Sequence, residues 1–362
     1  MLASRLLRAA VATARVTTHS KSQSRSHSHL PLTGLFAVNK PADLTSTTII
    51  DHVQHVCQKN RAHPLVKRVL EMDGSKRAKR GLVKLGHGGT LDPLARGIVV
   101  WAKQMAVSLI RMGAGCKKLH NMTASSKIYI AEGRLGFSST TLDCTGSLVA
   151  EGPTDHVTRD SLIQALYAFK GEITQTPPLY SALSMDGKRL YDYAREGIAL
   201  PRDIPTRKVQ IHELELLSFS DDSIIPDPVL EQYGFRSSNY VTIATTSPKI
   251  LNFNTVFQPK PLTDSSVMSP DHVPIPTMPR GLFFHIRVHC SSGTYIRTLI
   301  ADIAARLGTV GHMTDLLRIE QSGFKLGGEA TLEMSDCEDV DKIDQAIQAG
   351  NRIWENRENS QL

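Results

Sequence analysis

The sequence predicts strands and helices within one domain, which fits an α+β fold class. Residues 282–290 alternate apolar side chains with phenylalanine, histidine and arginine, and this period of two indicates a half-buried strand. The turn at Ser291–Thr294 leads into a helix that Gly308 ends and whose apolar positions recur at helical spacing: Ile296, Leu299, Ile300, Ile303 and Leu307. Arg297 therefore lies in the first turn of a helix, at the end of a central strand.

Earlier segments add elements of both kinds. Gly34–Val38 predicts a short buried strand that ends at Asn39-Lys40-Pro41, and Thr45 or Ser46 caps the helix that follows. In the strand predicted at Lys127–Leu135, Tyr129 faces away from Ile128 and Ile130. The remaining predicted elements are helices at Thr158–Lys170 and Leu190–Glu196, ended by Gly171 and Gly197, and a strand at Val209–Leu217.

The composition narrows the class of protein. The 362 residues carry a net charge of +7 with a pI of about 9.1, a balance that suits a polyanionic partner. No apolar run is long enough to span a membrane. No pair among the five cysteines has metal-ligand spacing. We therefore expect reduced thiols in an intracellular compartment, no membrane segment and no metal site.

Residues 1–30 contain no acidic residue and are rich in arginine, serine and alanine. As a helix, Met1–Val16 would place Leu2 and Leu6 on the same side. This pattern is typical of a mitochondrial transit peptide, and the alternative is a disordered basic arm that contacts the partner directly. The expected location is the mitochondrion, with the nucleus as a second compartment.

One segment concentrates the residues that carry chemistry. Residues 86–97, with the sequence GHGGTLDPLARG, present one carboxylate, Asp92, on a loop in which glycines permit close approach and Pro93 restricts the backbone. On its own, this segment would be interpreted as a glycine-rich turn. Four further motifs occur with it in a fixed order: Lys40-Pro41, Lys127-Ile128-Tyr129, Pro177–Leu183 and Ser292–Thr298.

Together these five motifs resemble the TruB-type tRNA pseudouridine synthases, which isomerise uridine 55 of the T-loop. The resemblance covers roughly Gly34 to Phe324. It implies the pseudouridine synthase fold, with a mixed, mostly antiparallel central sheet, flanking helices and a central RNA cleft. It also implies that tRNA is the partner and that no cofactor is needed, because moving the ribose bond from N1 to C5 involves no redox change. We expect the chain to act as a monomer.

The resemblance implies three catalytic residues. Asp92 matches the family's catalytic aspartate, which acts either as a nucleophile at C1′ or as a base on the ribose. Arg297 matches the arginine that pairs with this aspartate, and an arginine is suitable because it stays charged and so favours the ionised carboxylate. Tyr129 matches the tyrosine that stacks on the flipped uracil and is placed to assist proton removal from C5.

Further residues are expected to bind the substrate or to support the site. His87 matches the histidine that supports the flipped nucleotide, and Lys40 is expected to support the catalytic loop. In the pair Leu317-Arg318, the leucine is expected to pack on the base or its support and the arginine to contact the backbone. The expected substrate-binding set is His87, Lys40, Tyr295, Leu317 and Arg318, with Tyr180 and Arg195 nearby.

The predicted organisation has a transit-like segment at 1–30, a catalytic domain at 31–325 and a C-terminal tail at 326–362 that is too short for the RNA-binding barrel of many relatives. Residues 59–84 form a basic insertion without strong periodicity, expected to be mobile and to lie along an RNA backbone. The alternatives for this insertion are a solvated loop or a nuclear-import patch. Residues 221–280 form a loop-rich insertion between two strands.

Two departures from the family pattern bear on the predicted function. Ser184 stands where relatives usually have lysine, and residues 101–112 lengthen the element behind the catalytic loop. The predicted function is isomerisation of uridine 55 in tRNA by a member of the stand-alone eukaryotic branch. The alternatives are a tRNA-binding or tRNA-folding protein that has lost catalysis, and a structural protein of the mitochondrial translation apparatus.

Overall fold

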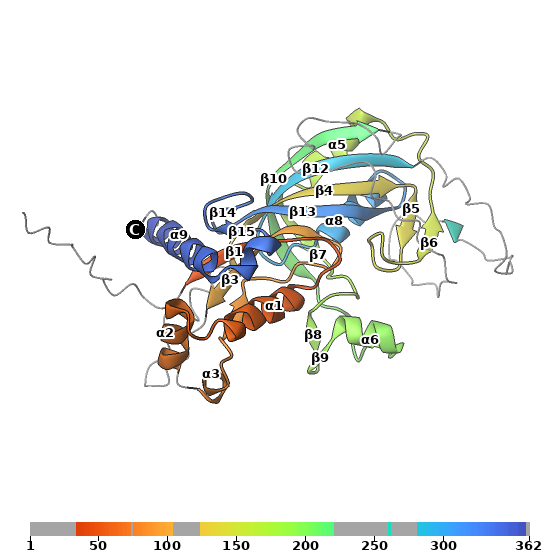
Figure 1. The fold of residues 1–362 in the computed structure, drawn as a ribbon. Helices are drawn as coiled ribbons and strands as arrows, with labels where there is room; N and C mark the ends of the chain where they lie inside the picture. Colours follow the sequence, from red (N-terminus) through yellow and green to blue (C-terminus); the bar gives the residue numbers. More distant parts are fainter. Residues whose placement is uncertain (1–33, 74, 104–123, 221–259, 262–280, 360–362) are drawn as a thin grey trace, which may run out of the picture. The chain divides into compact units, whose positions relative to one another are not determined.

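The computed structural model describes residues 34–73, 75–103, 124–220, 260–261 and 281–359, and its central feature is a mixed sheet (Figure 1). Ten strands of the described residues form this sheet in the order β15-β1-β3-β13-β4-β12-β10-β7, with β14 beside β13 and β2 beside β3. Their bounds are β1 Leu35–Lys40, β2 Leu85–His87, β3 Arg96–Lys103, β4 Lys127–Leu135, β7 Gly171–Gln175, β10 Arg207–Ser220, β12 Leu282–Cys290, β13 Gly311–Gln321, β14 Phe324–Lys325 and β15 Thr331–Leu332.

The pairing in this sheet is mostly antiparallel. The two parallel pairs are β1 with β15 and β3 with β13, and the other neighbours run antiparallel. Within the described residues there are also two small sheets, formed by β5 Phe137–Ser139, β6 Leu148–Glu151 and β11 Lys260–Pro261, and by β8 Ser184–Met185 and β9 Lys188–Arg189. The expected fold class, α+β with a mixed and mostly antiparallel sheet, is confirmed.

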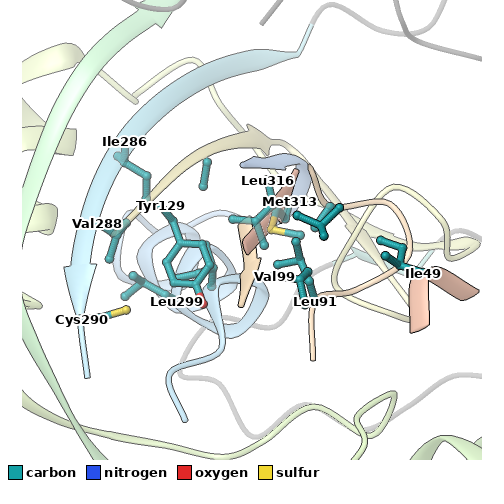
Figure 2. Close-up of a cluster of buried hydrophobic side chains, with 14 of the residues drawn as sticks. Ile49, Leu91, Val99, Tyr129, Ile286, Val288, Cys290, Leu299, Met313 and Leu316 are labelled. Atoms are coloured by element: carbon teal, nitrogen blue, oxygen red, sulfur yellow. The ribbon is translucent and has the colours of Figure 1, made fainter. Parts of the chain in front are cut away.

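Two apolar cores pack against opposite faces of β1. The larger core contains Tyr129, Val288 and Leu299, and Figure 2 shows these side chains together. A second core joins Leu35 of β1 to Trp354. The helical bounds are α1 Ser46–Lys59, α2 Pro64–Asp73, α3 Lys76–Lys79, α5 Arg159–Ala168, α6 Leu190–Glu196, α8 Ile296–Arg306, the short 3₁₀ helix η1 Met334–Glu338 and α9 Val340–Asn359.

Local sequence signals predicted several boundaries correctly. Strand β12 has the predicted bounds, and α6 ends at Gly197, whose φ of 64° is the left-handed conformation that favours glycine. Thr45, the first of the two predicted candidates, caps α1 by accepting a hydrogen bond from the backbone N–H of Thr48. The helix predicted at Thr158–Lys170 is shorter, because Thr158 is its cap and Phe169 already follows its last turn.

Two expectations about the organisation are corrected by the structure. The basic insertion at 59–84 is helical, because Val66 and Val69 of α2 are buried in the larger core. The segment 326–362 was expected to be a tail, but β15, η1 and α9 are packed parts of the domain, and Trp354 on α9 is only 4% exposed. The apolar positions of α9 are spaced along a long amphipathic helix, which supplies the reason for its packing.

Several predicted features lie outside the described residues. These are the transit-like segment 1–30, residues 104–112 of the lengthened element, and the insertion 221–280 apart from the two residues of β11. Among the residues that the structure does describe, no helix is long and apolar enough to cross a membrane.

Candidate active site

An ion pair between a carboxylate and a guanidinium lies at the centre of the candidate active site. Asp92 is in the loop between β2 and β3, and Arg297 is the second residue of α8. The Nε atom of Arg297 lies 2.9 Å from Oδ2 of Asp92. The side chain of Arg297 is 5% exposed and that of Asp92 is 35% exposed. The structure therefore brings together the two residues that the sequence paired, with the carboxylate open to solvent on one side.

Three further contacts hold the guanidinium in place. Nη1 of Arg297 donates to the carbonyl of Thr141 at 2.9 Å and lies 3.3 Å from Oδ2 of Asp143. Nη2 donates to the carbonyl of Tyr180 at 2.9 Å, which places Tyr180 beside the site as expected. Since these partners approach from different directions, only the planar fork of an arginine can satisfy them together.

Asp143 is the site residue that the sequence analysis missed. Its side chain is 5% exposed, and Oδ1 accepts hydrogen bonds from the hydroxyl of Thr141 at 2.6 Å and from the N–H of Thr145 at 3.0 Å. An aspartate among threonines is the usual pattern of a local turn, so nothing in this segment signals a contact with α8. The left-handed φ of 60° at Leu142, which no sequence pattern indicated, turns the carboxylate toward the site.

The surroundings of Asp92 act on its protonation in opposite directions. Burial raises the pKa of this carboxyl group, the nearby Arg297 lowers it, and the negative charge of Asp143 raises it again. Burial has the largest effect, so the pKa lies above the usual value for aspartate, although the exposed third of the side chain moderates the shift. The guanidinium is therefore the main group that opposes the effect of burial and favours the ionised form of Asp92.

A buried lysine supports the loop that carries Asp92. Lys40 is fully buried, and its Nζ donates to the carbonyls of Pro41, Leu44 and Pro93, each at 2.8 Å. Burial lowers the pKa of this amine to about 8. All three donors of the ammonium group are used by the backbone, so Lys40 supports the loop. Its expected place in the substrate-binding set is corrected, because no donor is left for a substrate.

Other links tie the same loop to α1 and β13. The hydroxyl of Ser46 accepts from the N–H of Leu91 at 3.2 Å, and the side-chain amide of Gln321 donates to the carbonyl of Gly88 at 2.6 Å. Nε of Arg318 donates to the carbonyl of Ile98 at 2.6 Å, at the base of the loop. The loop that carries Asp92 is thus held by one segment before it in the chain, α1, and by one far after it, β13.

Tyr129 lies close to the Asp92–Arg297 ion pair, within the larger core. The residue is 8% exposed, and Figure 2 shows its ring among Val288, Cys290 and Leu299. Burial raises the pKa of the phenol, whereas a hydrogen bond and the positive charge of Arg318 lower it. Arg318 is therefore placed at the site, where its guanidinium bonds to groups of the protein itself.

Two other predicted residues flank the site. His87 is in β2, and burial lowers its pKa, so the imidazole is neutral at pH 7. Tyr295 is the residue before α8, and the side chain of Gln175 bonds to both its N–H (3.1 Å) and its carbonyl (3.2 Å). The guanidinium of Arg207 lies 4.9 Å from the centre of the Tyr295 ring. Tyr295 thus fixes the start of the helix that carries the catalytic arginine.

Leu317 is the one predicted site residue that the structure does not bring to the site. Successive residues of a strand face opposite sides, and Leu317 is buried with Ile130 on the face of the sheet opposite to Tyr129. The expectation that this leucine packs on the base is therefore corrected. It had been linked to Arg318 as a neighbouring pair, but only the arginine faces the site.

The described parts of the two departures from the family pattern, Ser184 and residues 101–103, show regular local structure. Ser184 is exposed in β8, where its hydroxyl donates to the carbonyl of Lys188 at 3.3 Å. Strand β3 stays in register with β1 as far as the pair of Ala102 with Leu35. The strand behind the catalytic loop is therefore regular where it is described. In the described part of the chain, no group of three or more histidine, cysteine, aspartate or glutamate residues could hold a metal ion.

A mixed sheet that carries the Asp92–Arg297 ion pair and the buried Tyr129 is the arrangement that the sequence resemblance implies. Residues 76–229 match the model of the TruB family pseudouridylate synthase, N-terminal domain. The chain is 33% identical over 346 residues to tRNA pseudouridine synthase 4 of Saccharomyces cerevisiae, covering 86% of this chain and 82% of the yeast protein. This chain belongs to the TruB family of pseudouridine synthases.

Two further matches complete the comparison. Pseudouridylate synthase TRUB1 of Mus musculus is 30% identical over 319 residues, which cover 88% of this chain and 71% of the mouse protein. The crystal structure of a Cbf5-Nop10-Gar1 complex aligns with a TM-score of 0.43 and 20% identity. That alignment covers 84% of this chain and 54% of the solved chain.

Proposed function

We propose that this protein is a tRNA pseudouridine synthase that converts uridine 55 of the T-loop to pseudouridine, with Asp92 as the reacting carboxylate. The observation that carries the proposal is the contact of the half-exposed Asp92 with the enclosed Arg297. The names of the yeast and mouse relatives support the reaction class, and the yeast name also supports tRNA as the substrate.

The proposed reaction needs one ionised carboxylate. The bond between N1 and C1′ breaks, a bond between C5 and C1′ forms, and the proton of C5 leaves while N1 gains one, so atoms and electrons balance within the base. Asp92 serves either as a nucleophile at C1′ or as a base on the ribose, and both roles require its charged form. Arg297 favours this form, and its hydrogen bonds to backbone carbonyls hold the guanidinium in place when the substrate binds.

The base must also be taken out of the stacked loop, which costs roughly a few kcal/mol. We assign Tyr129 to hold the flipped uracil and to assist removal of the C5 proton, since the phenol lies near both Asp92 and Arg318. His87, as a neutral imidazole, can donate one hydrogen bond and accept another, which suits support of a nucleotide.

The location of the protein is also part of the proposal. The arginine-rich and acid-free residues 1–30 support import into the mitochondrion, with the nucleus as a second compartment. A fusion of residues 1–30 to a fluorescent protein should accumulate in mitochondria. A diffuse signal would contradict the assignment.

The decisive experiment is release of tritium from tRNA transcripts labelled at C5 of uridine, with the full chain and its Asp92→Asn variant. We expect release by the wild type only, with tRNA affinity of the variant within a few-fold. The matched control is Asp43→Asn, which should keep full activity. Asp43 is an exposed carboxylate near the same loop, and its backbone N–H donates to the carbonyl of Pro93. Binding of tRNA without release by the wild type would favour the alternative, a tRNA-binding protein that has lost catalysis.

A further inference from the structure

The segment between α1 and β2 forms a surface that the catalytic site does not use. We call residues 64–80, with helices α2 and α3, the basic platform (Figure 1). It contains two acidic residues, exposed Glu71 and buried Asp73. Its six basic residues are all exposed: Lys67, Arg68, Lys76, Arg77, Lys79 and Arg80.

The platform is attached firmly to the domain. Val66 and Val69 are 1% and 3% exposed, and they pack with residues of α1, β2 and α9 around a common apolar cavity. Two hydrogen bonds tie the end of the segment to α1 and its C-terminal turn: Gln54 donates to the carbonyl of Val83 at 3.2 Å, and Arg61 to that of Arg80 at 2.8 Å. The basic side chains are thus displayed by a fixed structure.

Within the described part of the chain, ion pairs neutralise little of the platform's positive charge. Lys67 lies 3.9 Å from Glu71, which is the one ion pair of the platform among the described residues. The other five basic side chains have no acidic partner within 4.0 Å in that part of the chain. Like charges held together repel one another, so a surface of this kind favours a polyanion.

Helix α1 sets the distance between the platform and the catalytic loop. Its first residue, Ser46, contacts Leu91 in that loop, and its last residue, Lys59, precedes α2 by four residues. A helix of 14 residues is about 21 Å long. Since each strand of a duplex carries a phosphate about every 3.4 Å, this distance corresponds to roughly six phosphates along one strand.

We propose that the basic platform binds the phosphate backbone of the duplex stem that carries the target loop. The stem lies along α1, so that its loop reaches Asp92 while the backbone further down the stem contacts Lys76, Arg77, Lys79 and Arg80. Contacts to phosphates carry no sequence information, which allows the same surface to hold stems of different sequence. This inference rests on the proposed function for the identity of the loop.

The test compares two hairpins that share one T-loop but differ in stem length by one helical turn, about 10 base pairs. Binding to the full chain is measured against salt concentration for Asp92→Asn, alone and combined with K76Q/R77Q/K79Q/R80Q. Each lost phosphate contact lowers the log–log salt slope by about 0.9, so four lost contacts lower it by about 3.6. Between 50 and 200 mM salt, the parent should then lose on the order of 100-fold more affinity than the combined variant.

We also expect the longer stem to bind more tightly than the shorter one to the parent and equally to the variant. The matched control neutralises four exposed basic residues elsewhere in the domain and should keep the parent slope. These are Arg159 at the start of α5, Lys170 just after α5, Arg306 of α8 and Lys325 of β14. K67Q/R68Q is a second, smaller variant of the platform and should lower the slope by up to about 1.8.

Two results would overturn the inference: a salt slope that both platform variants leave unchanged, or a longer stem that raises affinity equally for the parent and the four-residue variant. The platform would then be a nuclear-import patch or a solvated surface. Tritium release in parallel separates this outcome from failure of the proposed function. With Asp92 restored, the four-residue variant should show a raised KM and an unchanged kcat at saturating RNA. Absence of release by the wild type, with normal slopes, would instead overturn only the proposed reaction.

Discussion

Replacing Arg297 by methionine should move the acid limb of the pH–rate profile to higher pH. At the observed distance of 2.9 Å, two unit charges attract by about 6 kcal/mol at an effective dielectric constant of about 20. The carboxylate of Asp92 is 35% exposed, so solvent screening reduces this attraction, and we take about half, or about 3 kcal/mol. Loss of this attraction removes the largest influence that lowers the pKa of Asp92, so this pKa should rise in the variant.

The sign follows from the form of Asp92 that reacts. The ionised carboxylate is active, and loss of the guanidinium favours the protonated form, so activity is lost at pH values where the wild type still works. The assay is tritium release under single-turnover conditions across the pH range in which the protein stays folded by circular dichroism. Arg306→Met, an exposed arginine at the other end of α8, is the control and should leave the profile unchanged.

A second variant separates charge from geometry. Arg297→Lys keeps a positive charge but cannot reach Asp92, Asp143 and two backbone carbonyls at once, so its rate should fall while its acid limb moves by less than in the methionine variant. An acid limb that stays in place in Arg297→Met, with a uniformly lower rate, would refute the role of the guanidinium in keeping Asp92 ionised.

Three further variants test other parts of the molecule. Asp143→Asn removes a negative charge that raises the pKa of Asp92, so its acid limb should move to lower pH, measured by the same assay; a move to higher pH would contradict this. Gly97→Ala drives a Cβ into the backbone carbonyl oxygen of Arg318 at a φ of 101°, so urea unfolding should show a loss of several kcal/mol. Gly187→Ala, also at positive φ but in open space, should lose about 1–2 kcal/mol. Trp354→Ala should lower the free energy of unfolding by about 3–5 kcal/mol, and Glu355→Ala, at an exposed position, by less than about 0.5. Equal losses would contradict the packing of α9 in the core.

The main elements of the fold were predictable because their signals are local. The alternation in β12 and the apolar spacing in α8 arise within ten or so residues and need no partner for their interpretation. Glycine at the end of α6 and threonine at the start of α1 are similarly local, since each satisfies the backbone next to it.

The missed elements depend on what they pack against. In α2, Val66 and Val69 are surrounded by charged residues, so the apolar side is narrow and becomes meaningful only beside α1 and α9. Helix α9 has a low mean hydropathy for the same reason, and its Trp354 is buried by β1, which is about 300 residues earlier in the chain. Periodicity in a short window does not report such distant partners.

The same distinction applies to the candidate site: residues in continuous motifs were predictable, and residues whose place depends on the fold were not. The resemblance placed Asp92, Arg297 and Tyr129 correctly near one another, because the motifs that contain them are continuous in sequence. Asp143 was missed because its contact with Arg297 depends on a loop conformation, and Leu317 was misplaced because neighbouring residues of a strand face opposite sides.

The way the catalytic loop is held has a consequence for synthesis of the chain. Gln321 and Gly88 are hydrogen-bonded although they are 233 residues apart. At about 5–20 residues per second, roughly 10–50 s pass between translation of the loop and translation of β13, which fixes it. During this time the nascent chain carries Asp92 without the contacts of Arg318 and Gln321. Catalytic competence should therefore be acquired late, and ribosome-bound chains that end before β13 should lack it.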